Sequence, residues 1–400
     1  MTMRYYALDA WRGVFALFIM LTHLGVAWHG YSTGFIRSTY LFVDYYFVLS
    51  GFVISTAYAS KISNYSDFWS FIVKRIGRIY PLHIFMLAVF VGLELVKLLA
   101  AYYGHSPRNA PFSGDTSIQS LITNILLIHS LGIHHILTWN YPSWCVSTEF
   151  FAYIIFAVVV LFIRPISEKL SLLSFFALML LGLFIIISFS PLNQDTTYDY
   201  GFFRCLADFT CGILIYSFTK KHPIRFGHFR NLAEFGIIAI VVAFVTLAGR
   251  SKASYAAPMI FSLMIIVFYR QEGFLSKILS SSFFQKLGDW SYSIYMIHAF
   301  FIINITERPI HIIEKYFGIS LSKEVVLPDS TDLMPNTSVI TDLGGLYQGD
   351  LLVLAVVVAC VLTARQTYRW IEIPGRNYLI RKFGTSSIQN SVSPVPAKIE

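Results

Sequence analysis

The stretch LDAWRGVFALFIMLTHLG, residues 8–25, decides the fold class of the chain. It is apolar and as long as the roughly 17–25 residues that cross a bilayer as a helix. It nevertheless contains Asp9, Arg12 and His23. Ionisable side chains inside a span are costly and usually face the interior of a helix bundle. The stretch therefore predicts a membrane helix that carries one polar, functional face.

The composition extends this prediction to the whole chain of 400 residues, of which 56% are hydrophobic and only 13% are charged. Soluble domains carry about 25% charged residues, and in lipid only helices and closed barrels satisfy the backbone. Apolar runs such as FAYIIFAVVVLFI, residues 151–163, do not alternate as barrel strands do. The predicted class is all-α, a polytopic membrane helix bundle. The net charge of +8 comes from basic residues between the spans and indicates no nucleic-acid partner.

Ten spanning helices are expected, and the distribution of Lys and Arg orients them. The expected spans are 11–30, 37–58, 79–101, 147–163, 170–190, 202–218, 231–249, 254–270, 288–305 and 350–371. Basic residues gather in every second interval, which the positive-inside rule assigns to the cytoplasm together with both termini. The alternative is an eleventh span at 120–132, but it would turn the basic interval 219–230 outward. This segment is therefore expected to lie in the interface or to be re-entrant.

The expected organisation is a single membrane domain over residues 1–383 and a disordered cytoplasmic tail over residues 384–400. The tail is rich in Ser, Pro, Asn, Gln and Lys, which is typical of disorder. The largest extramembrane piece is an extracytoplasmic loop over residues 306–349, which is too small for a catalytic domain. Any chemistry is therefore expected within the membrane bundle.

Helical spacing places the polar residues of the first span on one face. Arg12 and His23 are 11 residues apart in the sequence, which is about three turns and about 16 Å along a helix. Asp9 precedes Arg12 by three residues and shares its face. Histidine is the side chain best suited to proton transfer near neutral pH. We therefore expect His23 to be catalytic, deep in the membrane, with Arg12 at the cytoplasmic boundary; the alternative is a core histidine above two interface anchors.

Two carboxylates are further catalytic candidates. Asp44 lies in FVDYYFVLSGFVIS, residues 42–55, and an unpaired buried carboxylate is too costly for a mere packing role. Glu149 lies about one turn inside the fourth expected span, in YPSWCVSTEFF. Either carboxylate is expected to orient His23 or to position a substrate. Ser50 and Gly51 in the second span are interpreted as packing residues, because small side chains let helices approach closely.

A basic cluster is the candidate binding site for a phosphorylated cosubstrate. In KRIGRIYPLH, Arg75 and Arg78 are three residues apart on one helix face, and Lys74 lies beside them. Arginine binds phosphate oxygens bidentately. The alternative is a set of anchors that touch lipid headgroups on the cytoplasmic side.

Three residues are candidates for substrate binding. Trp144 is an aromatic residue at the expected outer interface. Arg204 lies in the sixth expected span four residues before Asp208, and the alternative to substrate binding is that the two simply neutralise each other. His298 lies near the middle of the ninth span, in SYSIYMIHAF.

The sequence predicts no metal site. HSLGIHH, residues 129–135, has no thiolate or carboxylate to complete a ligand set. Cys145, Cys205, Cys211 and Cys360 show no ligand spacing and are expected to pack as small hydrophobic residues. A P-loop and a G-x-S-x-G motif are both absent from the sequence.

In order, these motifs resemble those of the membrane-bound acyltransferase 3 family, the bacterial O-acyltransferases and O-acetyltransferases of surface glycans. The segments that carry the resemblance are LDAWRG with His23, FVDYYFVLSGFVIS, KRIGRIYPLH, YPSWCVSTEFF and SYSIYMIHAF. The resemblance itself runs from about residue 5 to residue 380. The resemblance implies a ten-helix bundle that takes an acetyl or similar acyl group from cytoplasmic acyl-CoA. The implied acceptor is a hydroxyl of a cell-surface or exported polysaccharide or glycolipid, such as lipopolysaccharide or exopolysaccharide, on the outer face.

The resemblance also implies roles for individual residues. His23 matches the essential histidine of the family and Arg12 its partner arginine, while Arg75 and Arg78 match the pair thought to meet the donor. Cys145 stands where the family commonly has a serine, which puts a role for that hydroxyl in doubt. The chain resembles the stand-alone members without an SGNH domain. The implied cosubstrate is acetyl-CoA with no metal, the other partners are the glycan acceptor and membrane lipids, and the implied location is the bacterial inner membrane.

Residues and resemblance together predict that His23 acts as general base on the incoming hydroxyl. An acyl-histidine intermediate stays open, because imidazole is also a nucleophile. A secondary transporter or flippase would also place charges in its spans, but transporters commonly show paired repeats and broken helices, and neither is evident. A non-catalytic scaffold would tolerate replacement of every buried charge.

Overall fold

The chain is an assembly of helices with one small sheet. The computed structural model describes residues 4–104, 109–326 and 337–384. The helices are α1 Tyr6–His23, α2 Gly34–Arg37, α3 Phe42–Tyr58, α4 Tyr65–Tyr102, α5 Ile118–Ile125, α6 Trp144–Val158, α7 Glu168–Phe189, α8 Gly201–Lys221, α9 Arg230–Ala248, α10 Ala257–Phe268, α11 Phe274–Leu279, α12 Ser282–Phe301, α13 Arg308–Phe317, α14 Leu346–Thr367 and α15 Ile373–Phe383. Strands β1 Ser322–Val326 and β2 Thr337–Thr341 pair antiparallel. The all-α prediction is confirmed.

Three helices continue through a wider π-helical turn. Val159–Ile163 extends α6, Ile302–Glu307 joins α12 to α13, and Tyr368–Glu372 joins α14 to α15. Such turns interrupt the regular hydrogen-bond ladder and are frequent at functional sites. The last of them carries Glu372, which becomes part of the site described below.

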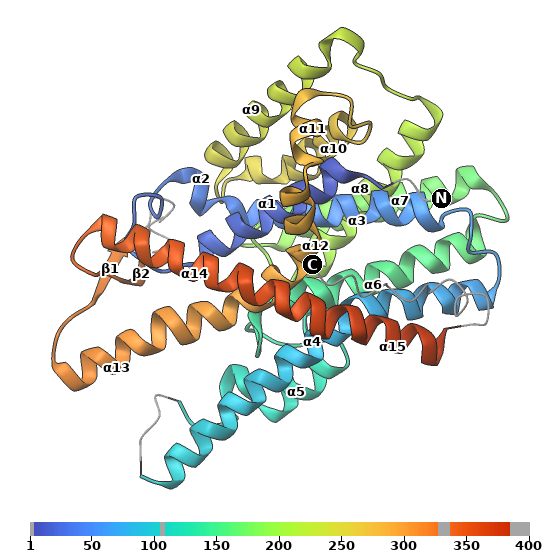
Figure 1. The fold of residues 1–400 in the computed structure, drawn as a ribbon. Coiled ribbons are helices and arrows are strands. Elements are labelled where there is room, and N and C mark those ends of the chain that lie inside the picture. Colours follow the sequence, from blue (N-terminus) through green and yellow to red (C-terminus); the bar gives the residue numbers. More distant parts are fainter. Residues whose placement is uncertain (1–3, 105–108, 327–336, 385–400) are drawn as a thin grey trace.

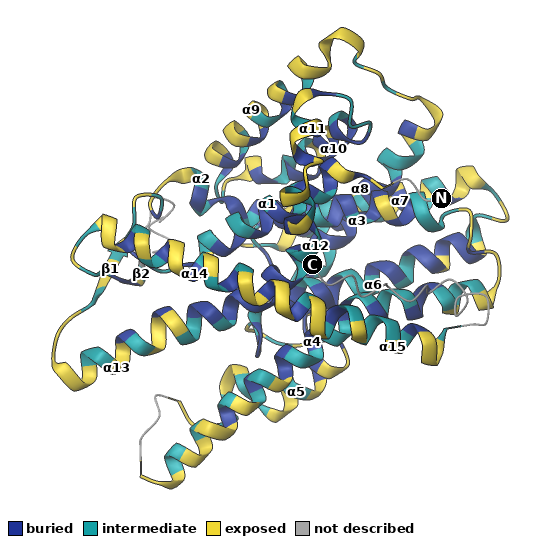
Figure 2. Cartoon of the chain, in the orientation of Figure 1, coloured by how far each residue is buried: buried dark blue, intermediate teal, exposed yellow. Residues whose placement is uncertain are grey.

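The centre of the bundle is built from α1, α3, α8 and α12 (Figure 1). Helix α3 packs along α8, and α1 packs along α12. Buried residues concentrate on these central helices, whereas α9, α13 and the end of α4 show many exposed residues (Figure 2). Large exposed side chains on the outer helices, such as Leu180, Phe184 and Leu247, are apolar. An apolar periphery around a more polar centre is the arrangement expected of a bundle in lipid.

Glycine residues allow the backbones of α3 and α8, and those of α1 and α12, to approach closely. A Cβ added at Gly51 of α3 would collide with the backbone of Phe209 in α8, and one at Gly212 of α8 would collide with the backbone of Val48. On α12, a Cβ at Gly288 would collide with the backbone of Asp9 in α1. The packing role predicted for Gly51 is therefore confirmed, because no side chain fits between these backbones.

We expect Gly51→Ala to destabilise the folded protein by about 3 kcal/mol, at the upper end of overpacking effects, because the clash involves backbone that cannot move aside. Gly236→Ala in α9 is the matched control, since nothing lies within 4 Å of its added Cβ. The measurement is the fraction of folded protein that survives heating in detergent. Equal survival of the two variants would contradict this account of the α3–α8 contact.

A helix lies at each of the ten positions where a span is expected. Among the described residues, seven helices are long and apolar enough to cross a membrane by length and composition. The remaining three expected spans are α1, α10 and α12. Helices α1 and α12 hold polar residues that line pockets, and α10 has 12 residues. The crossing of all ten therefore stays a prediction.

Among the expected boundaries that differ from the structure are those of the first span and of the interval 306–349. The first helix ends at His23 instead of continuing to residue 30, because the backbone after it pairs with β2. Thr341 donates to the carbonyl of Gly25 at 2.8 Å, and Ala27 donates to that of Thr341 at 2.8 Å. The interval 306–349, expected to be a loop, contains α13, both strands and the start of α14.

The apolar segment 120–132 is not a span. Its helix α5 has 8 residues, about 12 Å long at ~1.5 Å per residue, which is far short of a bilayer. The segment then continues in turns. This result agrees with the choice of ten expected spans over eleven. The tail prediction for residues 384–400 lies, apart from Gly384, outside the described residues.

Candidate active site

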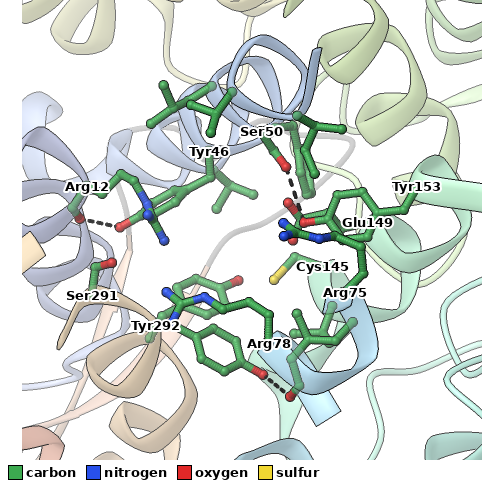
Figure 3. Close-up of a pocket in the computed structure, with 18 of the residues that line it drawn as sticks. Arg12, Tyr46, Ser50, Arg75, Arg78, Cys145, Glu149, Tyr153, Ser291 and Tyr292 are labelled. Carbon is green, nitrogen blue, oxygen red and sulfur yellow. Dashed lines mark hydrogen bonds between the residues drawn. The ribbon is translucent and has the colours of Figure 1, made fainter. Parts of the chain in front are cut away.

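A large pocket lies between α1, α3, α4, α6 and α12 and contains about 920 Å³ of empty space, counting the part open to solvent. Its polar lining residues are Asp9, Arg12, Tyr46, Ser50, Arg75, Arg78, Cys145, Glu149, Tyr153, Ser291, Tyr292 and Tyr295. Figure 3 shows Arg12, Arg75, Arg78 and Glu149 around its open centre. A pocket with apolar walls and a few convergent polar groups is typical of sites that bind a small molecule or cofactor.

Arg75 is the one cation in the lining of this pocket that pairs with no carboxylate of the described residues. None of the ion pairs among the described residues includes Arg75, and its buried Nε has no hydrogen-bond partner there. Its guanidinium instead lies over the rings of Tyr58 at 5.3 Å, Phe71 at 5.7 Å and Tyr153 at 5.8 Å from the centroids. Aromatic faces hold a guanidinium without cancelling its charge, so Arg75 remains available to an anion.

The other two arginines of the large pocket have acidic partners. Arg78 forms an ion pair with Glu372, whose side chain is 1% exposed, and Ser293 donates to the same carboxylate at 3.1 Å. Arg12 pairs with Asp9 at 3.6 Å. Asp9 therefore braces Arg12, as its position on the same face of α1 suggests.

An opening rich in arginine leads into the large pocket. We call it the arginine mouth; it is lined by Arg4, Asp9, Arg12, Arg75, Arg78, Gly288, Asp289, Tyr368 and Arg376. Five arginines face two aspartates here, so the mouth carries a net positive charge. Four of its residues, Asp9, Arg12, Arg75 and Arg78, also line the large pocket, so the two spaces adjoin.

A small pocket, with about 430 Å³ of empty space counting the part open to solvent, lies at the opposite end of α1. Its lining residues are Ile19, His23, Tyr40, Val43, Leu137, Tyr141, Pro142, Trp144, Asp195, Thr197, Arg204, Tyr295 and His298. Val43 and Tyr295 line both this pocket and the large one. The two pockets therefore meet at a shared wall made by these two side chains.

Two histidines face each other in the small pocket with the same tautomer. Nδ1 of His23 donates to the carbonyl of Ile19 at 2.7 Å, and Nδ1 of His298 donates to that of Tyr295 at 2.6 Å. A carbonyl only accepts hydrogen bonds, so each Nδ1 carries the proton and each Nε2 keeps its lone pair. The ring centroids are 5.3 Å apart. His298 is 1% exposed and its Nε2 has no partner among the described residues, whereas His23 is exposed. The site therefore offers two basic nitrogens.

The hydrogen bond to Ile19 corrects one expectation about His23. Neither Asp44 nor Glu149 orients the ring, because the backbone carbonyl one turn earlier already holds Nδ1. Glu149 lines the large pocket, on the other side of the shared wall. Asp44 lines neither pocket.

Asp44 is instead the partner of Arg204. Their side chains are 0% and 1% exposed, and the carboxylate accepts from Arg204 at 2.6 Å and 2.8 Å. Gln194 donates to the same carboxylate at 2.7 Å. The alternative in which Arg204 and Asp208 neutralise each other is therefore wrong: Asp44 of α3 supplies the counter-charge across the α3–α8 contact. The Arg204 guanidinium also lies 5.6 Å from the Trp144 ring centroid, which fixes one wall of the small pocket.

The structure thus distributes the expected site residues over two pockets. His23, Trp144, Arg204 and His298 share the small pocket, and Arg12, Arg75, Arg78 and Glu149 share the large one. Lys74 lines neither; its ammonium lies 5.8 Å from the ring centroid of Tyr58.

Sequence reasoning missed several residues of the site. Tyr295 forms the shared wall, Tyr46 donates from the large pocket to the carbonyl of Arg12, and Glu372 neutralises Arg78. Tyr295 lies three residues before His298 in the quoted ninth-span motif, so the helical period could have placed it about one turn from His298. Nothing in the spacing signals the contact of Arg78 with Glu372, because 294 residues separate them.

His129 and His134, in the segment 129–135, contact side-chain hydroxyl groups. His129 accepts from or donates to the hydroxyl of Ser143 at 3.1 Å and stacks on His83, and His134 contacts the hydroxyl of Thr123 at 2.7 Å. Within residues 4–104, 109–326 and 337–384, no group of three or more His, Cys, Asp or Glu side chains is placed to hold a metal ion.

Comparison with known proteins identifies the class of this site. A family model described as an acyltransferase domain matches residues 5–323, well over half of the chain. The chain belongs to the acyltransferase 3 family. No curated protein and no solved structure matches it. The matched range of this acyltransferase contains the residues of the small pocket and of the large pocket, while Glu372 and Arg376 lie beyond it.

Proposed function

We propose that the acyltransferase moves an acetyl or similar short acyl group from acyl-CoA to a hydroxyl of a cell-surface or exported polysaccharide or glycolipid. The observation that carries the proposal is the meeting of the two pockets at Val43 and Tyr295, one entered past arginines and the other holding two histidines. With the orientation that the positive-inside rule favours, the large pocket opens to the cytoplasm and the small one to the outer face of a bacterial inner membrane.

The arginine mouth matches the chemistry of CoA. CoA carries a 3′-phosphate and a pyrophosphate, and guanidinium groups bind phosphate oxygens bidentately. Arg75 has no acidic partner among the described ion pairs, and Arg376 adds a further guanidinium at the rim. The uncharged pantetheine arm would then occupy the large pocket, with its thioester at the shared wall. The five arginines of the mouth also attract a polyanion over a distance.

The small pocket supplies a base and a holder for the acceptor. Nε2 of His23 takes the proton of the acceptor hydroxyl while its oxygen bonds to the thioester carbonyl carbon. The C–S bond breaks, the CoA sulfur receives the proton from His23, and free CoA leaves through the large pocket. Nε2 of His298 accepts a hydrogen bond from a hydroxyl of the same sugar, and the Trp144 ring gives the sugar a flat apolar wall. Asp44 acts through Arg204 as a positioning residue.

The proposal is tested by incubating membranes that contain the protein with acetyl-CoA labelled in the acetyl group and with glycan from cells that lack the protein. Label in the glycan is the expected result. Glycan mass spectrometry of cells with and without the protein should show the loss of an acetyl increment. A transporter would move the glycan without any label entering it, and that result would overturn the proposal.

We expect Arg75→Gln to weaken acetyl-CoA binding about tenfold, because a charge-assisted hydrogen bond contributes about 1.5–3 kcal/mol and 1.4 kcal/mol is a factor of ten. Lys74→Gln is the matched control, since Lys74 precedes Arg75 in α4 but lines neither pocket. Binding of labelled acetyl-CoA to the solubilised protein is the measurement. An equal loss in both variants would reduce the arginine effect to general surface charge.

Direct transfer and an acyl-histidine intermediate are separated by a single-turnover reaction without acceptor. We propose direct transfer, in which all label stays on acetyl-CoA until glycan is added. Label that becomes attached to the protein in the absence of acceptor, and disappears in the His23→Ala variant, would establish the acyl-histidine route instead.

A further inference from the structure

We propose that the acceptor is anionic and that Arg37 binds its phosphate or carboxylate group in a side pocket next to the small pocket. This inference rests on the proposed function and names the chemical class of the acceptor. The side pocket contains about 510 Å³ of empty space, counting the part open to solvent, and is lined by Gly34, Arg37, Ser38, Tyr40, Thr246, Gly249 and Arg250.

The side pocket and the small pocket share a wall. Tyr40 lines both, and its hydroxyl donates to the carbonyl of Gly249 at 2.7 Å, which holds the ring between them. A molecule with a charged group in the side pocket can therefore present a neighbouring hydroxyl to the histidines.

The arginines that line the small pocket and the side pocket differ in whether they have an acidic partner. Arg204 is neutralised by Asp44, and Arg250 pairs with Asp195 at 2.9 Å. Among the described residues no ion pair includes Arg37. An acceptor with an anionic group would supply the acidic partner that Arg37 lacks among these residues.

The surroundings of Arg37 hold its guanidinium ready for an anion. Arg37 is the last residue of α2, which Thr33 caps by accepting from the amide of Ile36 at 3.4 Å. The guanidinium lies 5.4 Å from the ring centroid of Tyr31. Its buried Nε has no hydrogen-bond partner among the described residues. An unsatisfied buried donor costs about 1–3 kcal/mol, and a phosphate or carboxylate oxygen would remove this cost.

The chemical class is tested with glycan from cells that lack the protein, separated by anion exchange before the transfer reaction with labelled acetyl-CoA. We expect the label in the anionic fraction. Mild acid, which releases glycan from a lipid phosphate, and carbodiimide with borohydride, which reduces carboxylates to alcohols, then distinguish the two sources. Loss of acceptor activity after one treatment identifies the phosphate or the carboxylate. Label in the neutral fraction, or activity that survives both treatments, would overturn the inference.

The role of Arg37 is tested by Arg37→Gln and Arg37→Lys, with Arg225→Gln as the control on an exposed arginine outside the pockets. We expect Arg37→Gln to raise the KM for the glycan about tenfold with kcat little changed, since one charge-assisted contact contributes about 1.4 kcal/mol or more. Arg37→Lys should recover part of the loss. Binding of labelled acetyl-CoA should match wild type, which shows that the variant is folded. An unchanged KM would remove Arg37 from acceptor binding.

Failure of this inference can be distinguished from failure of the proposed function. If the wild-type protein transfers no label to any fraction, the proposed function fails and the inference falls with it. If label enters only neutral glycan, the acyl transfer stands and the anionic acceptor alone is excluded.

Discussion

Replacing His23 by alanine is expected to lower acyl transfer about 10²–10⁴-fold, the range typical of a lost general base. The reason is that Nε2 of His23 is the exposed lone pair of the small pocket, fixed by the bond from Nδ1 to the carbonyl of Ile19. Binding of acetyl-CoA should be preserved, because His23 is not part of the large pocket. The measurement is transfer of labelled acetyl to glycan at saturating acetyl-CoA, with binding measured in parallel.

His228→Ala is the matched control for this prediction, since His228 is exposed and lines none of the pockets described above. It should transfer at the wild-type rate. His298→Ala should lower the apparent affinity for glycan more than it lowers the rate at saturation, because His298 holds the acceptor. Near-normal transfer by His23→Ala would remove His23 from the chemistry.

The second large effect is expected at the buried ion pair. Asp44→Asn leaves the Arg204 guanidinium, 1% exposed, without its hydrogen-bonded counter-charge. Removing one partner of a buried pair destabilises proteins by about 3–5 kcal/mol. We therefore expect Asp44→Asn to lose most of its folded protein on mild heating in detergent, as measured by size exclusion.

The control is an exposed pair. The side chains of His29 and Asp350 are 49% and 37% exposed, so Asp350→Asn should cost no more than about 1 kcal/mol. The double variant Asp44→Asn with Arg204→Gln should regain part of the lost stability, because it removes the guanidinium that the single variant leaves without Asp44. A single variant Asp44→Asn as stable as Asp350→Asn would show that the pair does not hold α3 to α8.

Local patterns made the fold and half of the site predictable. The lengths of the apolar stretches located the helices, and the spacing of Arg12 and His23 placed the two residues far apart along one helix. In the structure they line two adjoining pockets. These inferences need only the helical period and the cost of charge in lipid. The same reasoning identified Trp144 and His298 as candidate site residues, but it could not predict that they line the same pocket.

Contacts between distant segments could not be predicted. Asp44 and Arg204 are 160 residues apart, and the local alternative, Asp208, was the natural but wrong partner. The end of α1 at His23 depends on pairing with Thr341, more than 300 residues later. Such pairings follow from the packing of whole helices, which a single sequence does not specify.

The central claim is that the donor and the acceptor occupy two pockets that meet at Val43 and Tyr295. The most direct test is an experimental structure of the protein with acetyl-CoA bound. The account predicts the phosphates at Arg75 and the arginine mouth, with the thioester at Tyr295 facing Nε2 of His23. Acetyl-CoA bound outside the large pocket, or with its acetyl group turned away from the shared wall, would contradict it.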